Sequence, residues 1–185
     1  PARFFGRKTE IDNILTRLQT MQSVSVVGER RIGKSSLLYH LYQTGSEKIN
    51  KPGYRFLYCD LQEAHFHTAA GFFEAILKLL GIASHEVKPK NSLQQNLIAF
   101  SQSVEEMERA GERIVLCLDE FENLFKHRGE FTEDFFDHMR SQLSLGKLAF
   151  VTATKSSLQD LSIEGKLTSP FYNIFTTIPL GEFTE

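Results

Sequence analysis

The sequence predicts an α/β fold in which a mostly parallel, five-stranded sheet lies between two layers of helices. Short apolar runs alternate with segments whose apolar residues recur at helical spacing, an order typical of parallel sheets. The run Ile114–Leu118 is apolar at every position, as expected for a strand covered by helices on both faces. The 185 residues, 41% of them hydrophobic, can bury a sizeable core. We therefore expect residues 1–185 to form one three-layer α/β/α domain.

The first half of the chain alternates helical and strand patterns twice. A helix is predicted near the N-terminus by apolar residues at the i, i+3, i+4, i+7 spacing, and a later helix by the same spacing before Gly81. Glycine in the position that follows a helix end can adopt the left-handed conformation found there. In order, we expect a helix over 11–18, a strand over 23–27, a helix to about residue 43, a polar connection over 44–48, a strand over 54–60 and a helix over 73–80.

The second half continues the alternation. Ser92 and Gln95 form a capping-box pattern at the start of an apolar-periodic helix. Gly146 separates a phenylalanine-rich helix from a further strand. In order, we expect a loop over 83–91, a helix over 92–107, strand 114–118, a helix over 131–143, a strand over 148–151 that extends toward residue 154, and a fifth strand over 174–178.

The most informative motif is the segment Gly28–Ser36, which reads GERRIGKSS and completes the Walker A pattern G-x-x-x-x-G-K-[ST]. It lies between a β-branched run and a helical pattern, the context in which such a loop wraps a phosphate. Backbone N–H groups of the loop and of the helix N-terminus would point at the phosphates. The side chains of Arg30 and Arg31 also fit the solvent-exposed rim of the loop. The residues predicted to contact the nucleotide are Gly28, Arg31, Ile32, Gly33, Lys34, Ser35 and Ser36.

Two side chains of this loop have predicted chemical roles. Lys34 supplies a point charge to the β- and γ-phosphates, and the Ser35 hydroxyl group can ligate Mg²⁺. The sequence therefore predicts a P-loop domain that binds a nucleoside triphosphate, ATP or ADP, with Mg²⁺.

A second half of the site follows strand 114–118, which ends in the acidic pair Asp119 and Glu120, a Walker B pattern. Parallel strands present their carboxyl ends at the edge of the sheet where ligands bind. Asp119 is expected to hold Mg²⁺, usually through its water, and Glu120 to orient or deprotonate an attacking water molecule. A small-molecule kinase has no need of a water-activating carboxylate beside the Mg²⁺ aspartate, so the pair favours hydrolysis over phosphoryl transfer.

Thr154, at the tip of the fourth predicted strand, is a candidate for contact with the γ-phosphate, with Thr152 as the alternate. Threonine is also simply a good strand residue, and that alternative stays open. Glu122 could support the site or occupy a surface helix position. None of the six histidines shows metal-ligand spacing.

Composition narrows the possible partners and location. A formal net charge of −2 gives no basic signature, so nucleic acid is not indicated, although a local patch could form. No apolar run reaches the length of a membrane span. Cys59 and Cys117 lie in strand-like runs and are expected to be buried small hydrophobes in a reducing, cytoplasmic compartment. The absence of a first methionine and the abrupt stop at Glu185 suggest a piece of a longer protein.

With these residues placed, the chain resembles the STAND branch of the AAA+-related signalling NTPases, especially its bacterial members. The segment 4–10 is similar to the F-x-G-R-x-x-E stretch of that group, and 118–125, LDEFENLF, to its D-[QE]-F-E-E-L-F stretch. The segments 169–173 and 178–185 resemble its approach to a helical lid.

The resemblance implies a nucleotide-driven switch in which exchange of ADP for ATP drives self-association or partner assembly. It implies a sheet of order 5-1-4-3-2 and places Phe5, Gly6 and Arg7 beside the adenine. Many relatives carry an arginine after the fourth strand, where this chain has Lys155. Lysine lacks the bidentate fork of arginine, so γ-phosphate sensing at this position is expected to be weaker.

Two other functions fit the same residues. Archaeal chromosomal ATPases and replication initiators share the N-terminal segment and the acidic pair, and act on DNA. A nucleotide-stabilised interaction module that does not hydrolyse ATP needs only the binding loop.

Overall fold

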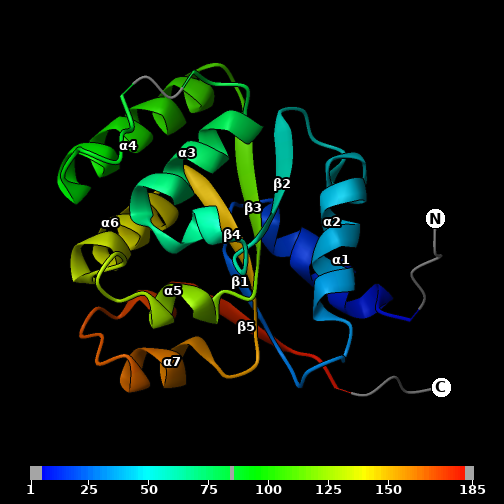
Figure 1. Ribbon diagram of the computed structural model, residues 1–185. Helices are drawn as coiled ribbons and strands as arrows, with labels where there is room; N and C mark the ends of the chain where they lie inside the picture. Colours follow the sequence, from blue (N-terminus) through cyan, green and yellow to red (C-terminus); the bar gives the residue numbers. More distant parts are fainter. Residues whose placement is uncertain (1–5, 84–85, 182–185) are drawn as a thin grey trace.

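The structure, a computed structural model, describes residues 6–83 and 86–181 of the chain. Its sheet has five strands, all parallel, in the order β2-β3-β4-β1-β5 (Figure 1). Read from the opposite edge, this is the order 5-1-4-3-2 that the resemblance implied, so the fold prediction is confirmed. The strands are β1 (Val24–Val27), β2 (Tyr54–Asp60), β3 (Arg113–Asp119), β4 (Leu148–Thr154) and β5 (Thr176–Pro179).

Helices cover both faces of the sheet and enclose two separate apolar cores. Alternate residues of β3 serve the two cores: Val115 and Cys117 face one, Leu116 and Leu118 the other. Successive side chains of a strand point to opposite faces. Because both faces of β3 are covered by apolar residues, its sequence shows no alternation of polar and apolar residues. One layer consists of α1 (Lys8–Leu18) and α2 (Lys34–Ile49); the other contains α3 (Ala69–Leu79), α4 (Leu93–Arg109), α5 (Glu122–Lys126), α6 (Glu133–Ser144), α7 (Leu158–Glu164) and the short 3₁₀ helices η1 (Ala64–His67) and η2 (Phe171–Ile174).

Phenylalanine dominates the larger core, which lies under α3 to α7. The Phe121 ring stacks on Phe171, with centroids 6.1 Å apart and an interplanar angle of 12°. Phe121 and Phe125 are both buried. The fully buried phenylalanines are Phe72, Phe73, Phe100, Phe121, Phe131, Phe135, Phe136, Phe150 and Phe171.

Two helix boundaries are confirmed: the start predicted from the capping box at Ser92 and the end predicted from Gly81. The Ser92 hydroxyl oxygen accepts a hydrogen bond from the Gln95 N–H group, and the Gln95 side chain accepts one from the Ser92 N–H group, completing the capping box. Gly81 has φ +75° and ends α3, with its N–H group donating to the Lys78 carbonyl. Only the backbone of glycine adopts this conformation without steric cost.

One predicted connection is wrong, because residues 44–48 continue helix α2 as far as Ile49. The predicted connection contains Gly45, and glycine is a residue type common in loops. A Cβ atom at Gly45 would lie 2.6 Å from the Phe56 ring of β2. The glycine therefore marks a close approach of helix and strand and not a break in the helix.

The fifth strand begins later than predicted, at Thr176 instead of residue 174. Residues 171–174 form η2, whose Phe171 ring is fully buried beneath α5 and α6. The need to bury this ring turns the chain before it can join the sheet. Pro179 ends β5, which lies at the edge of the sheet, where a missing N–H group is tolerated.

The cysteines lie where the sequence indicated. Cys59 and Cys117 are free and buried in β2 and β3, and burial raises the pKa of the Cys59 thiol to about 12. Across residues 6–83 and 86–181, the helices are all too short or too polar to cross a membrane.

Candidate functional site

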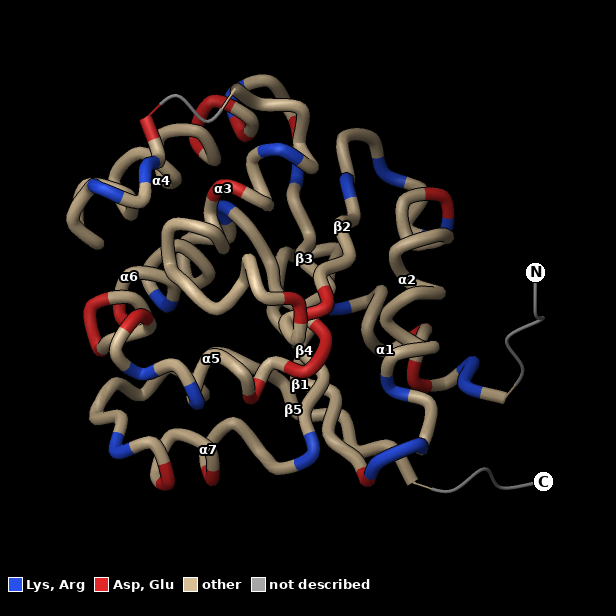
Figure 2. The backbone as a smooth tube through the Cα atoms, in the orientation of Figure 1, with Lys and Arg blue, Asp and Glu red and all other residues tan. Residues whose placement is uncertain are grey.

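The carboxyl ends of β1, β3 and β4 meet at one edge of the sheet, and β4 lies between the other two. The Gly28 N–H group donates to the Thr154 carbonyl oxygen at 3.2 Å, and the Phe121 N–H group donates to the Ala153 carbonyl oxygen at 3.1 Å. The loop after β1 and the loop after β3 are therefore both anchored on the last two residues of β4. Figure 2 shows basic positions on the loop that follows β1 and acidic positions where β2 and β3 end.

The loop of residues 28–33 leads directly into α2 through two left-handed residues. Arg31 has φ +64°, and Gly33, with φ +97°, is the N-cap of α2. Ser35 and Ser36 occupy the first turn of the helix and are exposed. The first N–H groups of a helix lack partners within the helix, so this end can bind an anion.

Gly28 is required by packing. A Cβ atom there would lie 2.8 Å from the Leu180 carbonyl oxygen. The Leu180 N–H group in turn donates to the Val27 carbonyl oxygen at 2.7 Å. The chain that follows β5 therefore seals one side of the loop, and only glycine fits between them.

The Lys34 side chain folds back over the loop. Its ammonium group donates to the carbonyl oxygens of Gly28 at 2.7 Å and Glu29 at 2.8 Å. An ammonium group has three donors. The third is available for a phosphate oxygen while the first two keep the side chain in place.

The Asp119 carboxylate is buried, with only 4% of the residue exposed, and both its oxygens accept hydrogen bonds. Oδ1 accepts from the Glu120 N–H group at 3.0 Å, and Oδ2 accepts from the Tyr58 hydroxyl group at 2.9 Å. A carboxylate offers about four acceptor positions, so each oxygen retains one. A hydroxyl group from Ser35 and these oxygens are ligands of the type that Mg²⁺ prefers. The residues present fit that ion.

Glu120 has a left-handed backbone, with φ +52°. The Asn123 N–H and side-chain amide groups both donate to the Glu120 carbonyl oxygen at 3.0 Å and hold this conformation. A non-glycine residue in this region costs on the order of 1 kcal/mol, and such strain clusters at functional sites. Within residues 6–83 and 86–181, no side chain pairs with the half-buried Glu120 carboxylate, which leaves it available as a base.

Thr152 and Thr154 are fully buried, and neither hydroxyl group has a hydrogen-bond partner among the described residues. Phe150 packs in the core under α3 to α7, whereas Ala153 packs under α1 and α2. Alternation along β4 therefore assigns both threonines to the face opposite the phosphate-binding helix. This placement favours the strand-residue alternative, and γ-phosphate contact by Thr154 stays a prediction.

Glu122 is partly buried at the start of α5. Its Oε1 atom accepts from the Lys155 N–H group at 3.4 Å, and its Oε2 atom is buried without a hydrogen-bond partner in the described part of the chain. Burial raises the pKa of this carboxyl group above its usual value. This environment favours support of the site over a surface position, and that role stays a prediction.

Sequence reasoning missed Tyr58. It lies in β2, and the register pairs Tyr58 with Cys117 and Asp60 with Asp119. Residues two apart in a strand share a face, so Tyr58 lies on the same face as Asp119. The order of the neighbouring strands, not a local motif, was the signal that could have revealed it.

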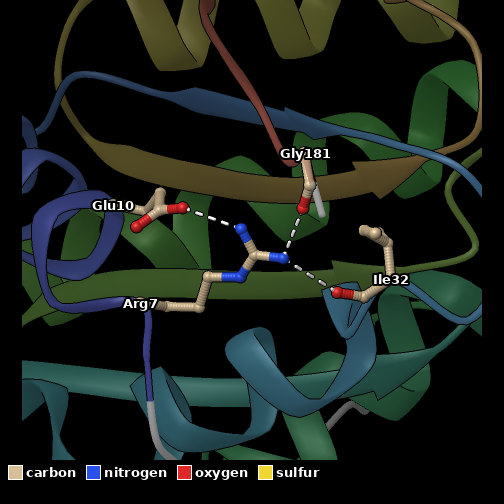
Figure 3. Close-up of polar contacts among 4 residues, drawn as sticks. All are labelled: Arg7, Glu10, Ile32 and Gly181. Carbon is tan, nitrogen blue, oxygen red and sulfur yellow. Dashed lines mark hydrogen bonds and ion pairs between the residues drawn. The ribbon is translucent and has the colours of Figure 1, made fainter. Parts of the chain in front are cut away.

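The N-terminal segment is joined to the loop by Arg7 (Figure 3). Its guanidinium group donates to Glu10 Oε1 at 2.9 Å, to the Ile32 carbonyl oxygen at 3.2 Å and to the Gly181 carbonyl oxygen at 2.6 Å. A cavity of about 460 Å³ beside α1 and α2 is lined in part by Gly6 and Arg7. Phe5 lies outside the described residues, and nucleotide contact by Phe5, Gly6 or Arg7 stays a prediction.

Several solved structures have the same fold. The Aeropyrum pernix ORC2 protein, in ADPNP and ADP complexes, matches with a TM-score of 0.74 and 14% identity over 97% of this chain and 50% of its own. Cdc6p from Pyrobaculum aerophilum matches with a TM-score of 0.66 and 17% identity over 97% of this chain and 46% of its own. The ADP complex of S. cerevisiae Hsp104 matches with a TM-score of 0.63 and 22% identity over 98% of this chain and 23% of its own.

This chain therefore spans about half the length of the two archaeal proteins. At these identities, the likeness shows the P-loop ATPase fold alone. No curated protein sequence gives a significant match. A family model described as novel STAND NTPase 1 matches residues 1–165. Because that match includes the loop of residues 28–33, the acidic pair and most of the described domain, the chain belongs to the novel STAND NTPase 1 family.

Proposed function

We propose that this chain is the ATP-binding and ATP-hydrolysing core of a multidomain signal-transduction switch whose nucleotide state controls assembly. The observation that carries the proposal is the joint anchoring of the phosphate-binding loop and the acidic pair on Ala153 and Thr154. That arrangement supports a site in which a phosphate and a water-activating carboxylate face one another. Membership in an NTPase family supports the same reaction.

Binding uses the loop and the start of α2. The N–H groups of residues 28–36 surround the phosphates, and Lys34 uses its third donor on them. Ser35 and Asp119 are the residues that would hold Mg²⁺. When bound, this ion neutralises charge on the phosphates.

Hydrolysis uses Glu120, which orients a water molecule and accepts its proton. Its carbonyl group is held by Asn123 and its N–H group by Asp119, so the side chain starts from a fixed backbone.

Phosphoryl-transfer sites usually add an arginine to stabilise the transition state. Within the chain the candidates are Arg128 and Arg140, which lie near or in the helix before β4, and nothing places either one at the loop. Arg128 is engaged elsewhere, with the Phe131 carbonyl group and Glu133. We therefore propose that a partner copy or a further domain supplies that charge.

A role on DNA is the alternative. The fold of the ORC2 and Cdc6p structures is compatible with it, but the net charge of −2 gives no general attraction to phosphate backbones. We favour the signalling switch because the family match is to STAND NTPases.

The test combines three measurements on the same protein: calorimetric titration with ATP, ADP and GTP in Mg²⁺, release of inorganic phosphate, and binding to labelled duplex DNA. The proposal expects ATP binding, slow hydrolysis and no DNA binding at physiological salt. Absence of binding to any nucleotide contradicts the whole proposal. Binding without hydrolysis in a single-turnover assay would favour the non-hydrolysing module, and salt-sensitive DNA binding the initiator-like alternative.

A further inference from the structure

The hydrogen bond between Tyr58 and Asp119 connects the edge strand of the sheet to the carboxylate assigned to Mg²⁺. Tyr58 Oη donates to Asp119 Oδ2 at 2.9 Å across two neighbouring strands. Among the residues that the structure describes, the other oxygen of Asp119 accepts a hydrogen bond only from the N–H group of the next residue. Tyr58 is therefore the side chain that determines how the carboxylate is turned.

Two donors on two different oxygens restrict rotation of the carboxylate about its Cβ–Cγ bond. An ion that binds through its water molecules needs those oxygens in one orientation, since Mg²⁺ demands near-ideal octahedral geometry. With only the Glu120 N–H donor, the Oδ2 side is free to turn. Because Asp119 is buried, the lost donor is not simply replaced by bulk water.

The Tyr58 ring is itself held by the helix that the phosphate-binding loop opens. Tyr39 of α2 packs edge-on against it, with centroids 5.5 Å apart and an interplanar angle of 88°, and Tyr42 lies 6.4 Å away. A tyrosine hydroxyl group is protonated at neutral pH, so this group acts as a donor to Asp119. The metal carboxylate and the phosphate helix are thus connected through one aromatic ring.

We propose that Tyr58 is a positioning residue for Mg²⁺, acting through Asp119 to orient the oxygens that accept the ion's water molecules. The proposal rests on the proposed function, because it assumes that Asp119 serves a metal bound with the nucleotide. Tyr58 does not touch the nucleotide in this account. Its removal should change metal affinity and leave phosphate binding by the loop intact.

The experiment compares wild type, Tyr58→Phe and Tyr42→Phe. The control removes a hydroxyl group from the same aromatic cluster, and that group has no hydrogen bond among the described residues. ATP affinity is measured by calorimetry in EDTA and over a series of Mg²⁺ concentrations. Mn²⁺ bound in the nucleotide complex is counted by electron paramagnetic resonance. Thermal unfolding of each protein without nucleotide completes the set.

For Tyr58→Phe we expect ATP affinity in EDTA within about twofold of wild type and a rise of about tenfold in the metal concentration at half-saturation, which corresponds to one charge-assisted hydrogen bond. Tyr42→Phe should match wild type in both. An unchanged metal half-saturation in Tyr58→Phe, with or without a lower melting temperature, would overturn the proposal. Equal losses of affinity in EDTA and in Mg²⁺ would also overturn it. If wild type binds no ATP, or binds it without regard to Mg²⁺, the proposed function has failed instead.

Discussion

Arg7 and Gly181, which lie 174 positions apart in the sequence, are joined by a hydrogen bond of 2.6 Å from the guanidinium group to the carbonyl oxygen. The same nitrogen atom donates to the carbonyl group of Ile32 in the phosphate-binding loop. One buried side chain therefore holds together the start of the domain, the loop and the segment that follows β5 (Figure 3).

We expect Arg7→Lys to lower the free energy of unfolding by about 1–3 kcal/mol, since lysine keeps the charge but cannot reach three acceptors with a planar fork. ATP affinity should fall as well, because Ile32 loses a contact that holds the loop. Urea denaturation and calorimetry measure the two effects. Lys8→Ala, at an exposed neighbouring position, is the control. Equal stability of Arg7→Lys and wild type would show that the three contacts are dispensable.

Lys34→Ala should lower ATP affinity at least tenfold, since a charge-assisted contact contributes about 1.5–3 kcal/mol. The same side chain bonds to the Gly28 and Glu29 carbonyl groups, so the melting temperature must be measured alongside. Arg30→Ala, on the exposed rim of the loop, is the charge-matched control and should bind ATP almost normally. Equal affinities of Lys34→Ala and wild type in a calorimetric titration would refute the role of the loop.

Glu120→Gln should retain ATP binding and reduce turnover about 100-fold or more, because the amide keeps the shape of the side chain and removes the base. Asp119→Asn should behave differently and weaken Mg²⁺-dependent binding as well as turnover. Phosphate release under single-turnover conditions distinguishes the two. A Glu120→Gln protein that hydrolyses ATP at the wild-type rate would exclude this residue as the catalytic carboxylate.

Gly45→Ala should destabilise the domain by about 1–3 kcal/mol, even though alanine is the better helix former by about 1 kcal/mol. The reason is the Phe56 ring, which a Cβ atom would meet at 2.6 Å. Gly129→Ala is the matched control, since a Cβ atom there meets nothing within 4 Å. Combining Gly45→Ala with Phe56→Leu should recover part of the loss in a denaturant titration.

The 185-residue chain on its own should be a monomer that binds nucleotide weakly and turns over ATP well below about 1 s⁻¹. A lid that excludes water and an arginine from a partner would each raise the rate. A protein extended beyond Glu185 should bind more tightly and self-associate with ATP. Light scattering and phosphate release test both proteins, and rapid multiple turnover by the short monomer would contradict the expectation.

What the sequence predicted correctly was determined by local chemistry. The loop between β1 and α2, the Ser92 capping box and the glycine after α3 each depend on a few neighbouring residues whose conformations have one low-energy solution. The order of the strands could not be predicted from such local features, because the same apolar runs fit any order of strands in a parallel sheet. It came from the resemblance to a family.

What the sequence could not predict depends on contacts between distant segments. Gly45 is typical of a turn until the Phe56 ring is placed against it. Tyr58 is an ordinary strand residue until β2 is paired with β3. The face on which Thr154 lies follows from the register of β4, which no pattern within the strand determines.

Because both loops are anchored on β4, the amino-acid sequence of this domain can change while the positions of the two loops are kept. Gly28 and Phe121 bond to consecutive carbonyl groups, those of Thr154 and Ala153. Consecutive carbonyl groups of a strand point toward opposite neighbouring strands, so Thr154 holds the loop after β1 on one side of β4 and Ala153 holds the loop after β3 on the other. The spacing of the two loops therefore depends on the backbone of the sheet. Core side chains can be exchanged on either face without changing that spacing, which agrees with a shared fold at 14% identity.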